Sequence, residues 1–87
     1  MNDSNHMQWH IQAYRCNSER VLIRCVKMPD DIHRLFWGFG LSKVSEQLVW
    51  GKTAQQLQFK RIPWADVPPR IRAIVRACLT SDCKIDA

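Results

Sequence analysis

The stretch RLFWGFGL, residues 34–41, lies between two predicted β-hairpins, so its conformation decides the architecture of the chain. It holds three aromatic residues and two glycines in eight positions. Counted from Ile32, the residues Leu35, Phe36 and Phe39 follow the i, i+3, i+4, i+7 spacing of an amphipathic helix. The spacing predicts a short helix of about two turns, which the glycines end early.

The residues before this stretch favour the same interpretation. Pro29 ends the preceding strand, and Asp30 or Asp31 can cap a helix, because a carboxylate accepts the N–H groups of the first turn and suits its dipole. Trp37 does not belong to the apolar stripe. In a helix it would therefore point away from the core.

A first β-hairpin is predicted on the N-terminal side of this segment. Residues 8–16, QWHIQAYRC, alternate between Trp9, Ile11 and Ala13 on one face and polar or aromatic residues on the other. Residues 20–28 are rich in β-branched side chains, and the polar NSE between the two runs is typical of a turn. The second strand is apolar on both faces near residues 21–23, so we expect it at the centre of a sheet or covered on both sides.

A second hairpin is predicted on the C-terminal side. Residues 46–51, EQLVWG, and 56–62, QLQFKRI, are strand-like runs separated by the polar KTAQ. In the later run, Leu57 and Phe59 share one face, and Pro63 ends the strand.

The clearest element is the segment WADVPPRIRAIVRACL, residues 64–79, which predicts an amphipathic helix. Asp66 is the candidate N-cap, and the prolines suit a first turn because their missing N–H is not needed there. Arg72 and Arg76 project from the side opposite the apolar stripe. That stripe consists of Val67, Ile71, Ile74, Val75 and Cys78.

The sequence therefore predicts an α+β fold with the order ββ–short α–ββ–α. The two hairpins form one four-stranded antiparallel sheet, because an isolated hairpin is not stable in water, and the C-terminal helix packs on one face. We expect one small domain over residues 1–87, with flexible tails at 1–7 and 80–87. The open sheet edges would also allow a homodimer.

Composition excludes several other classes of protein. No apolar run approaches the ~20 residues of a membrane span, and the polar N-terminus lacks the apolar region of a signal peptide. We therefore expect a cytoplasmic protein without a membrane partner. The four cysteines and three histidines show no zinc-ligand spacing, so no metal or cofactor is expected. Cys25 and Cys78 are expected in the core.

No catalytic pattern is present in the sequence. A nucleophile needs an adjacent base and a group that orients this base, and the serines, histidines and cysteines form no such local pattern. The carboxylates fall mostly at predicted turns and caps. The chain is therefore predicted not to be an enzyme.

Charge points to an anionic partner. The chain has a net charge of +5, and residues 52–76 alone hold six lysines and arginines against one aspartate. Arginine reaches phosphates and tryptophan stacks on bases, so the leading hypothesis is a regulatory or accessory protein that binds nucleic acid through this segment. The candidate residues are Lys60, Arg61, Trp64, Arg70, Arg72 and Arg76.

The alternative is a protein-binding adaptor, assembly factor or inhibitor. Four tryptophans are many for one small core, and tryptophan and arginine are enriched at interface hot spots. An exposed Trp37 beside Phe39, together with a sheet edge, would dock an acidic partner protein. The exposure of Trp37 distinguishes the two hypotheses.

Overall fold

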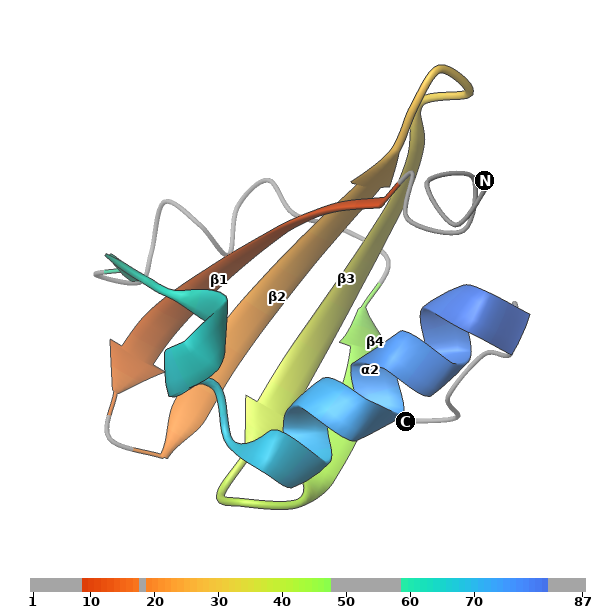
Figure 1. Cartoon of the computed structure of the whole chain (residues 1–87). Coiled ribbons are helices and arrows are strands. Elements are labelled where there is room, and N and C mark those ends of the chain that lie inside the picture. Colours follow the sequence, from red (N-terminus) through yellow and green to blue (C-terminus); the bar gives the residue numbers. More distant parts are fainter. Residues whose placement is uncertain (1–8, 18, 48–58, 82–87) are drawn as a thin grey trace.

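The structure is a computed structural model of the chain, and it describes residues 9–17, 19–47 and 59–81. Within these ranges five strands form one antiparallel sheet, and a C-terminal helix lies across one of its faces (Figure 1). The α+β class is therefore confirmed. The elements are β1 (Trp9–Asn17), β2 (Arg20–Lys27), β3 (Ile32–Phe39), β4 (Lys43–Gln47), β5 (Lys60–Ile62), the 3-10 helix η2 (Trp64–Asp66) and α2 (Pro69–Ser81).

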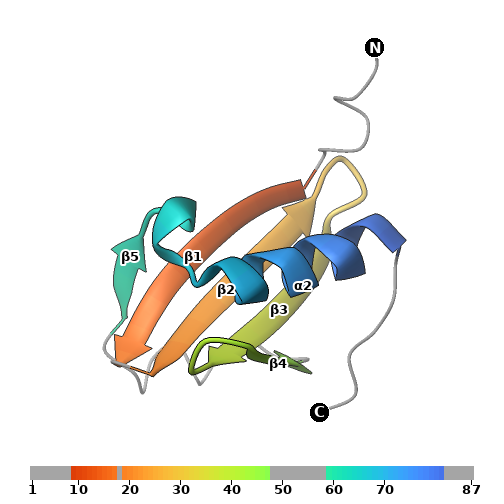
Figure 2. The same ribbon diagram turned by 60° about the horizontal axis from the view of Figure 1, so that its bottom comes forward.

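The strand order in the sheet is β4-β3-β2-β1-β5, and every neighbouring pair is antiparallel. The first four strands follow one another as a meander, whereas β5 joins the sheet beside β1, at the edge opposite β4 (Figure 2). Strand β2 lies in the middle, as its apolar residues on both faces predicted.

The predicted helix at residues 32–39 is wrong, because this segment is the strand β3. Residues 34–38 are all buried, since α2 covers one face of β3 and a second apolar cluster occupies the other. A strand that is buried on both faces shows no alternation, so its helical spacing is a coincidence. Asp30 and Asp31 are not helix caps but lie in the β2–β3 turn, where Asp31 has a φ of +57°.

The second predicted hairpin also needs correction. Strand β4 pairs with β3 and β5 pairs with β1, so these two strands lie at opposite edges of the sheet and do not pair with each other. The described sheet has five strands, not four. Residues 48–58, which include most of the predicted hairpin, lie outside the described residues.

The C-terminal helix is confirmed. It begins at Pro69 and buries Ile71, Val75, Cys78 and Leu79 against the sheet. Asp66, the expected N-cap, lies in η2, before the helix begins. The helix runs to Ser81, beyond the predicted start of the tail at residue 80, while residues 1–7 and 82–87 are outside the described ranges. No described helix has both the length and the apolar character needed to cross a bilayer.

The apolar side chains form two clusters, one on each face of the sheet. The larger cluster fills the space between the sheet and α2, and Ile23, Phe36 and Ile71 at its centre are fully buried. The smaller cluster, on the face away from α2, contains Leu22 and Trp37. Residues of β2 and β3 therefore alternate between two buried environments.

Gly38 lies where α2 crosses β3. A Cβ atom at this position would lie 2.7 Å from Cγ2 of Val21 and 2.8 Å from Cδ1 of Ile71. Since real Cβ atoms essentially never approach so closely, the missing side chain allows the helix to pack directly on the strand. This close approach is the structural reason for the first glycine of the WGFG motif.

Arg34 joins β3, β4 and α2 from within the core. Its Nε and Nη2 donate hydrogen bonds of 2.8 Å to the two carboxylate oxygens of Glu46 on β4. Its Nη1 donates to the carbonyl oxygen of Cys78 in α2, at 2.9 Å. The guanidinium carbon also lies 5.2 Å from the centre of the Phe36 ring. The side chain of Arg34 is 9% exposed and that of Glu46 is 12% exposed, so this ion pair is largely shielded from water.

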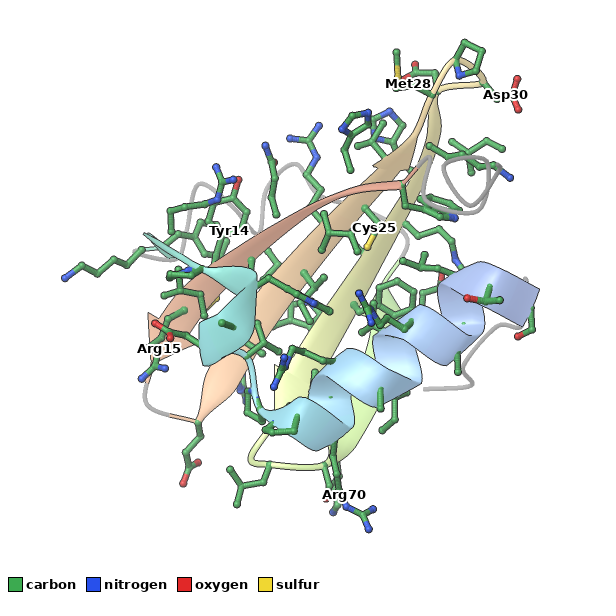
Figure 3. All side chains as sticks on the ribbon, viewed as in Figure 1. Tyr14, Arg15, Cys25, Met28, Asp30 and Arg70 are labelled. Carbon is green, nitrogen blue, oxygen red and sulfur yellow. The ribbon has the colours of Figure 1, made fainter. Side chains whose placement is uncertain are left out.

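The stability of the fold should decrease at alkaline pH because of Cys25. This residue lies on β2, on the sheet face that packs against α2 (Figure 3), and burial raises the pKa of its thiol from 9.0 to about 12, although nearby Arg34 opposes the shift. Above pH 9 the unfolded chain releases this proton and the folded chain keeps it, so the free energy of unfolding falls between pH 9 and about 12. Urea denaturation across this range should show a shallower decline for Cys25→Ala. Equal pH slopes for the two proteins would contradict this assignment.

Candidate nucleic-acid interface

Three of the six predicted binding residues lie around one hollow on the surface. The hollow has a volume of about 380 Å³ and is lined by Trp64, Pro69, Arg72, Ala73 and Arg76. The last four residues share one face of α2, because positions 69, 72, 73 and 76 are three or four residues apart. Trp64 comes from η2, so the hollow lies between the two helical elements. We call it the Trp–Arg hollow.

The position of Trp64 follows from the chain that leads to it. After β5, Pro63 opens the turn, and the N–H groups of Asp66 and Val67 donate to the carbonyl oxygens of Pro63 and Trp64, at 2.9 and 3.1 Å. Val67 is buried and fixes the end of this turn in the core. Trp64 itself is half-buried and packs against the larger apolar cluster. Its indole therefore has a defined place at the rim of the core.

The two arginines differ in how firmly they are held. Nε of Arg72 donates a 3.0 Å hydrogen bond to the carbonyl oxygen of Val67, and the side chain is half-buried. This contact orients the Arg72 guanidinium towards the segment that carries Trp64. Arg76, one turn further along α2, is exposed. One cation is therefore pre-positioned and the other can adapt to a ligand.

This arrangement suits a ligand that has both an aromatic ring and a negative charge. An indole offers a face for stacking, and guanidinium groups donate paired hydrogen bonds to phosphate or carboxylate oxygens. Asp66, the acidic residue of η2, lies two positions after Trp64 and is exposed. The two arginines give the hollow a positive balance despite this carboxylate.

The remaining three predicted residues lie elsewhere. The exposed side chain of Arg70 extends outward from the first turn of α2 (Figure 3), and Arg70 does not line the hollow. Lys60 and Arg61 are successive residues of β5, so they project to opposite faces of the sheet. Lys60 pairs with Arg15 of β1, and the Arg61 guanidinium lies 5.8 Å from the centre of the Tyr14 ring.

The residues of the alternative hypothesis are not an exposed aromatic patch. Trp37 is only 8% exposed and packs with Leu22 and Leu35 on the sheet face away from α2. Phe39 is half-buried, with the guanidinium carbon of Arg20 5.3 Å from its ring centre. The expectation that Trp37 points away from the core depends on a helix, and the segment is a strand.

The sequence interpretation missed basic residues on the strands. Arg20 and Lys43 lie on the sheet face away from α2, near Phe39, and neither was a candidate. The alternation of residues 20–28 already placed Arg20 and Arg24 on one face of a strand. Their relation to Lys43 and Arg61 depends on strand order and register, which the sequence did not predict.

Across residues 9–17, 19–47 and 59–81, no three His, Cys, Asp or Glu side chains are grouped so that they could hold a metal ion. Comparison of the chain with protein-family models, with curated proteins and with solved structures finds no significant match.

Proposed function

We propose that this protein is a non-catalytic binding module, regulatory or accessory in role, that contacts nucleic acid through the Trp–Arg hollow. The observation that supports the proposal is the meeting of one indole and two guanidiniums, from Trp64, Arg72 and Arg76, around one surface hollow. The net charge of +5 favours the approach of a polyanion.

In the proposed complex, base stacking and phosphate contacts contribute separately to the binding affinity. A base stacks on the indole of Trp64, which is held in place by its packing against the core. Phosphates flanking this base accept hydrogen bonds from Arg72 and Arg76. Stacking of this kind contributes about 1–3 kcal/mol per base and tolerates any base, so the hollow would show little sequence preference.

The proposal predicts a difference between two arginines on the same helix. Arg76→Ala should weaken binding of a fluorescent 16-nucleotide oligo(dT) and reduce the slope of log K against log salt by about 0.7, the value for one phosphate on a single strand. Arg70→Ala removes the same charge outside the hollow and should have the smaller effect. Fluorescence anisotropy between about 50 and 200 mM salt measures both quantities.

Trp64 provides the test of stacking. Trp64→Ala should weaken binding by about 5- to 150-fold, whereas Trp64→Phe, which keeps an aromatic face, should retain most of the affinity. Circular dichroism establishes that both variants are folded. The proposal fails if the unaltered protein does not bind the oligonucleotide at about 50 mM salt, or if Arg70→Ala and Arg76→Ala weaken binding equally.

A further inference from the structure

Arg15 of β1 and Lys60 of β5 lie directly opposite each other in the sheet. Two positions along the same ladder, Ala13 and Ile62 are also paired, and both pack into the larger apolar cluster on the α2 side. Because strand side chains alternate between the two faces, Arg15 and Lys60 project to the α2 side as well. Both are exposed. Two cations therefore face each other across the ladder, near the C-terminal end of β1 (Figure 3).

No carboxylate compensates this pair of charges. In the part of the chain that the structure describes, neither the Arg15 nor the Lys60 side chain makes an ion pair or a hydrogen bond. Like charges directly opposite each other destabilise a sheet. The Arg15–Lys60 pair therefore costs the free protein stability, and an anion bound between the two side chains would remove this cost.

The geometry of the pair suits a phosphate group. Opposed residues of an antiparallel ladder have Cβ atoms about 4.5–5.5 Å apart, so both side chains can reach one anion. Arginine donates paired hydrogen bonds to phosphate oxygens, and lysine adds a compact positive charge. The described ladder neighbours of the pair on this face, Ala13, Val21 and Ile62, offer no aromatic ring. The pair can therefore hold a phosphate but cannot stack a base.

The Arg15–Lys60 pair lies near the Trp–Arg hollow. Trp64 follows Lys60 by four residues, which span at most about 14 Å. The element η2, which carries Trp64, contacts β1, and α2 covers the sheet face to which the pair projects. A stacked strand of nucleic acid advances about 3.4 Å per nucleotide, so roughly four nucleotides cover the distance from Trp64 to Lys60.

We infer that the Arg15–Lys60 pair is a second phosphate-binding subsite, occupied by the same nucleic-acid strand that enters the Trp–Arg hollow. A base stacks on Trp64, and a phosphate roughly four nucleotides along the strand lies between Arg15 and Lys60. The inference rests on the proposed function and adds the direction in which the strand leaves the hollow. It also adds Arg15 to the binding residues, because only the β1–β5 register places this residue opposite Lys60.

The test compares two double variants that each lose two exposed positive charges. Arg15→Gln with Lys60→Gln removes the subsite. Arg70→Gln with Lys43→Gln is the matched control, because Arg70 does not line the hollow and Lys43 lies on β4, at the opposite edge of the sheet. Each protein is titrated with 16-nucleotide oligo(dT) between about 50 and 200 mM salt. Isothermal titration calorimetry gives the number of strands bound per protein.

For the R15Q/K60Q protein, we expect weaker binding and a slope of log K against log salt that falls by about 0.7, because one phosphate contact is lost. The R70Q/K43Q protein should keep the slope of the unaltered protein, and each protein should bind one strand. Without nucleic acid, R15Q/K60Q should melt at the same temperature as the unaltered protein or higher, since the two opposed charges are gone.

The possible failures are distinguishable. Equal salt slopes for the two double variants, or two strands bound per protein, would overturn the second subsite, while the Arg76→Ala effect would still identify the hollow as the site. A lower melting temperature for R15Q/K60Q would show that the pair stabilises the fold and would remove the argument for a bound anion. Poly-glutamate that competes as well as unlabelled oligo(dT) would reduce both proposals to general attraction of polyanions. Failure of oligo(dT) to bind the unaltered protein would remove both.

Discussion

Replacing Arg34 with methionine should lower the free energy of unfolding by about 3–5 kcal/mol, the usual loss when one member of a buried ion pair is removed. Methionine fills much of the volume but takes away the two hydrogen bonds to Glu46 and the one to the Cys78 carbonyl. The Glu46 carboxylate would then remain largely buried without the Arg34 guanidinium beside it. Urea denaturation followed by circular dichroism measures the loss.

A second variant separates the charge from the packing. Arg34→Met combined with Glu46→Leu removes both charges together, and apolar replacement of a whole buried pair is often near neutral. The double variant should therefore regain most of the stability that the single variant loses. A loss below about 1 kcal/mol in Arg34→Met would place the pair among ordinary surface ion pairs and contradict the structural assignment.

Replacing Gly38 with alanine should cost about 1–3 kcal/mol, the typical penalty for an extra group in a packed core. The added Cβ would meet Cγ2 of Val21 at 2.7 Å and Cδ1 of Ile71 at 2.8 Å. The β-branched Val21 has little freedom to rotate away, so α2 or β3 would have to shift. Urea denaturation again gives the change in stability.

Ile71→Val tests where this clash occurs, because it removes the Cδ1 atom. If α2 presses on Gly38, the combined variant should be less destabilised than the sum of the two single changes. Gly40→Ala is the matched control, because a Cβ added at Gly40 would have no atom within 4 Å. Gly40 has a φ of +60°, so the alanine should cost about 1–2 kcal/mol of stability through backbone strain alone, and this loss should not couple to Ile71→Val. Strict additivity between positions 38 and 71 would refute the close approach of Ile71 to Gly38.

The strands and the helix differed in how well they could be predicted. The stripe at Ile71, Val75 and Cys78 predicted α2 because one of its faces is in water and the other is buried, which makes the period visible. β1 was predictable because Trp9, Ile11 and Ala13 on one face alternate in the sequence with more polar residues on the other. β3 was not predictable, because both of its faces are buried and its sequence therefore shows no alternation. It also contains Arg34 and Gly38, which are unusual in a core: Arg34 is paired with Glu46, and Gly38 gives room for α2.

In the candidate site, too, only the residues that are close in sequence could be predicted to lie together. Arg72 and Arg76 were predictable neighbours because one helix carries both. The approach of Trp64 depends on a 3-10 turn that a hydrogen-bonded edge strand positions, and no local spacing indicates it. Lys60 and Arg61 were grouped with them by charge alone, and strand alternation instead divides these two residues between the faces of the sheet.

The strand order also bears on how the chain folds. Strands β1 to β4 pair with their neighbours in sequence, so they can form successive hairpins through short loops. The β1–β5 ladder joins Ala13 to Ile62, 49 positions further along, and closing such a long loop is entropically costly and slow. The Trp–Arg hollow depends on this late step, because β5 leads directly into Trp64. Nascent chains would therefore acquire the meander first and the Trp–Arg hollow last.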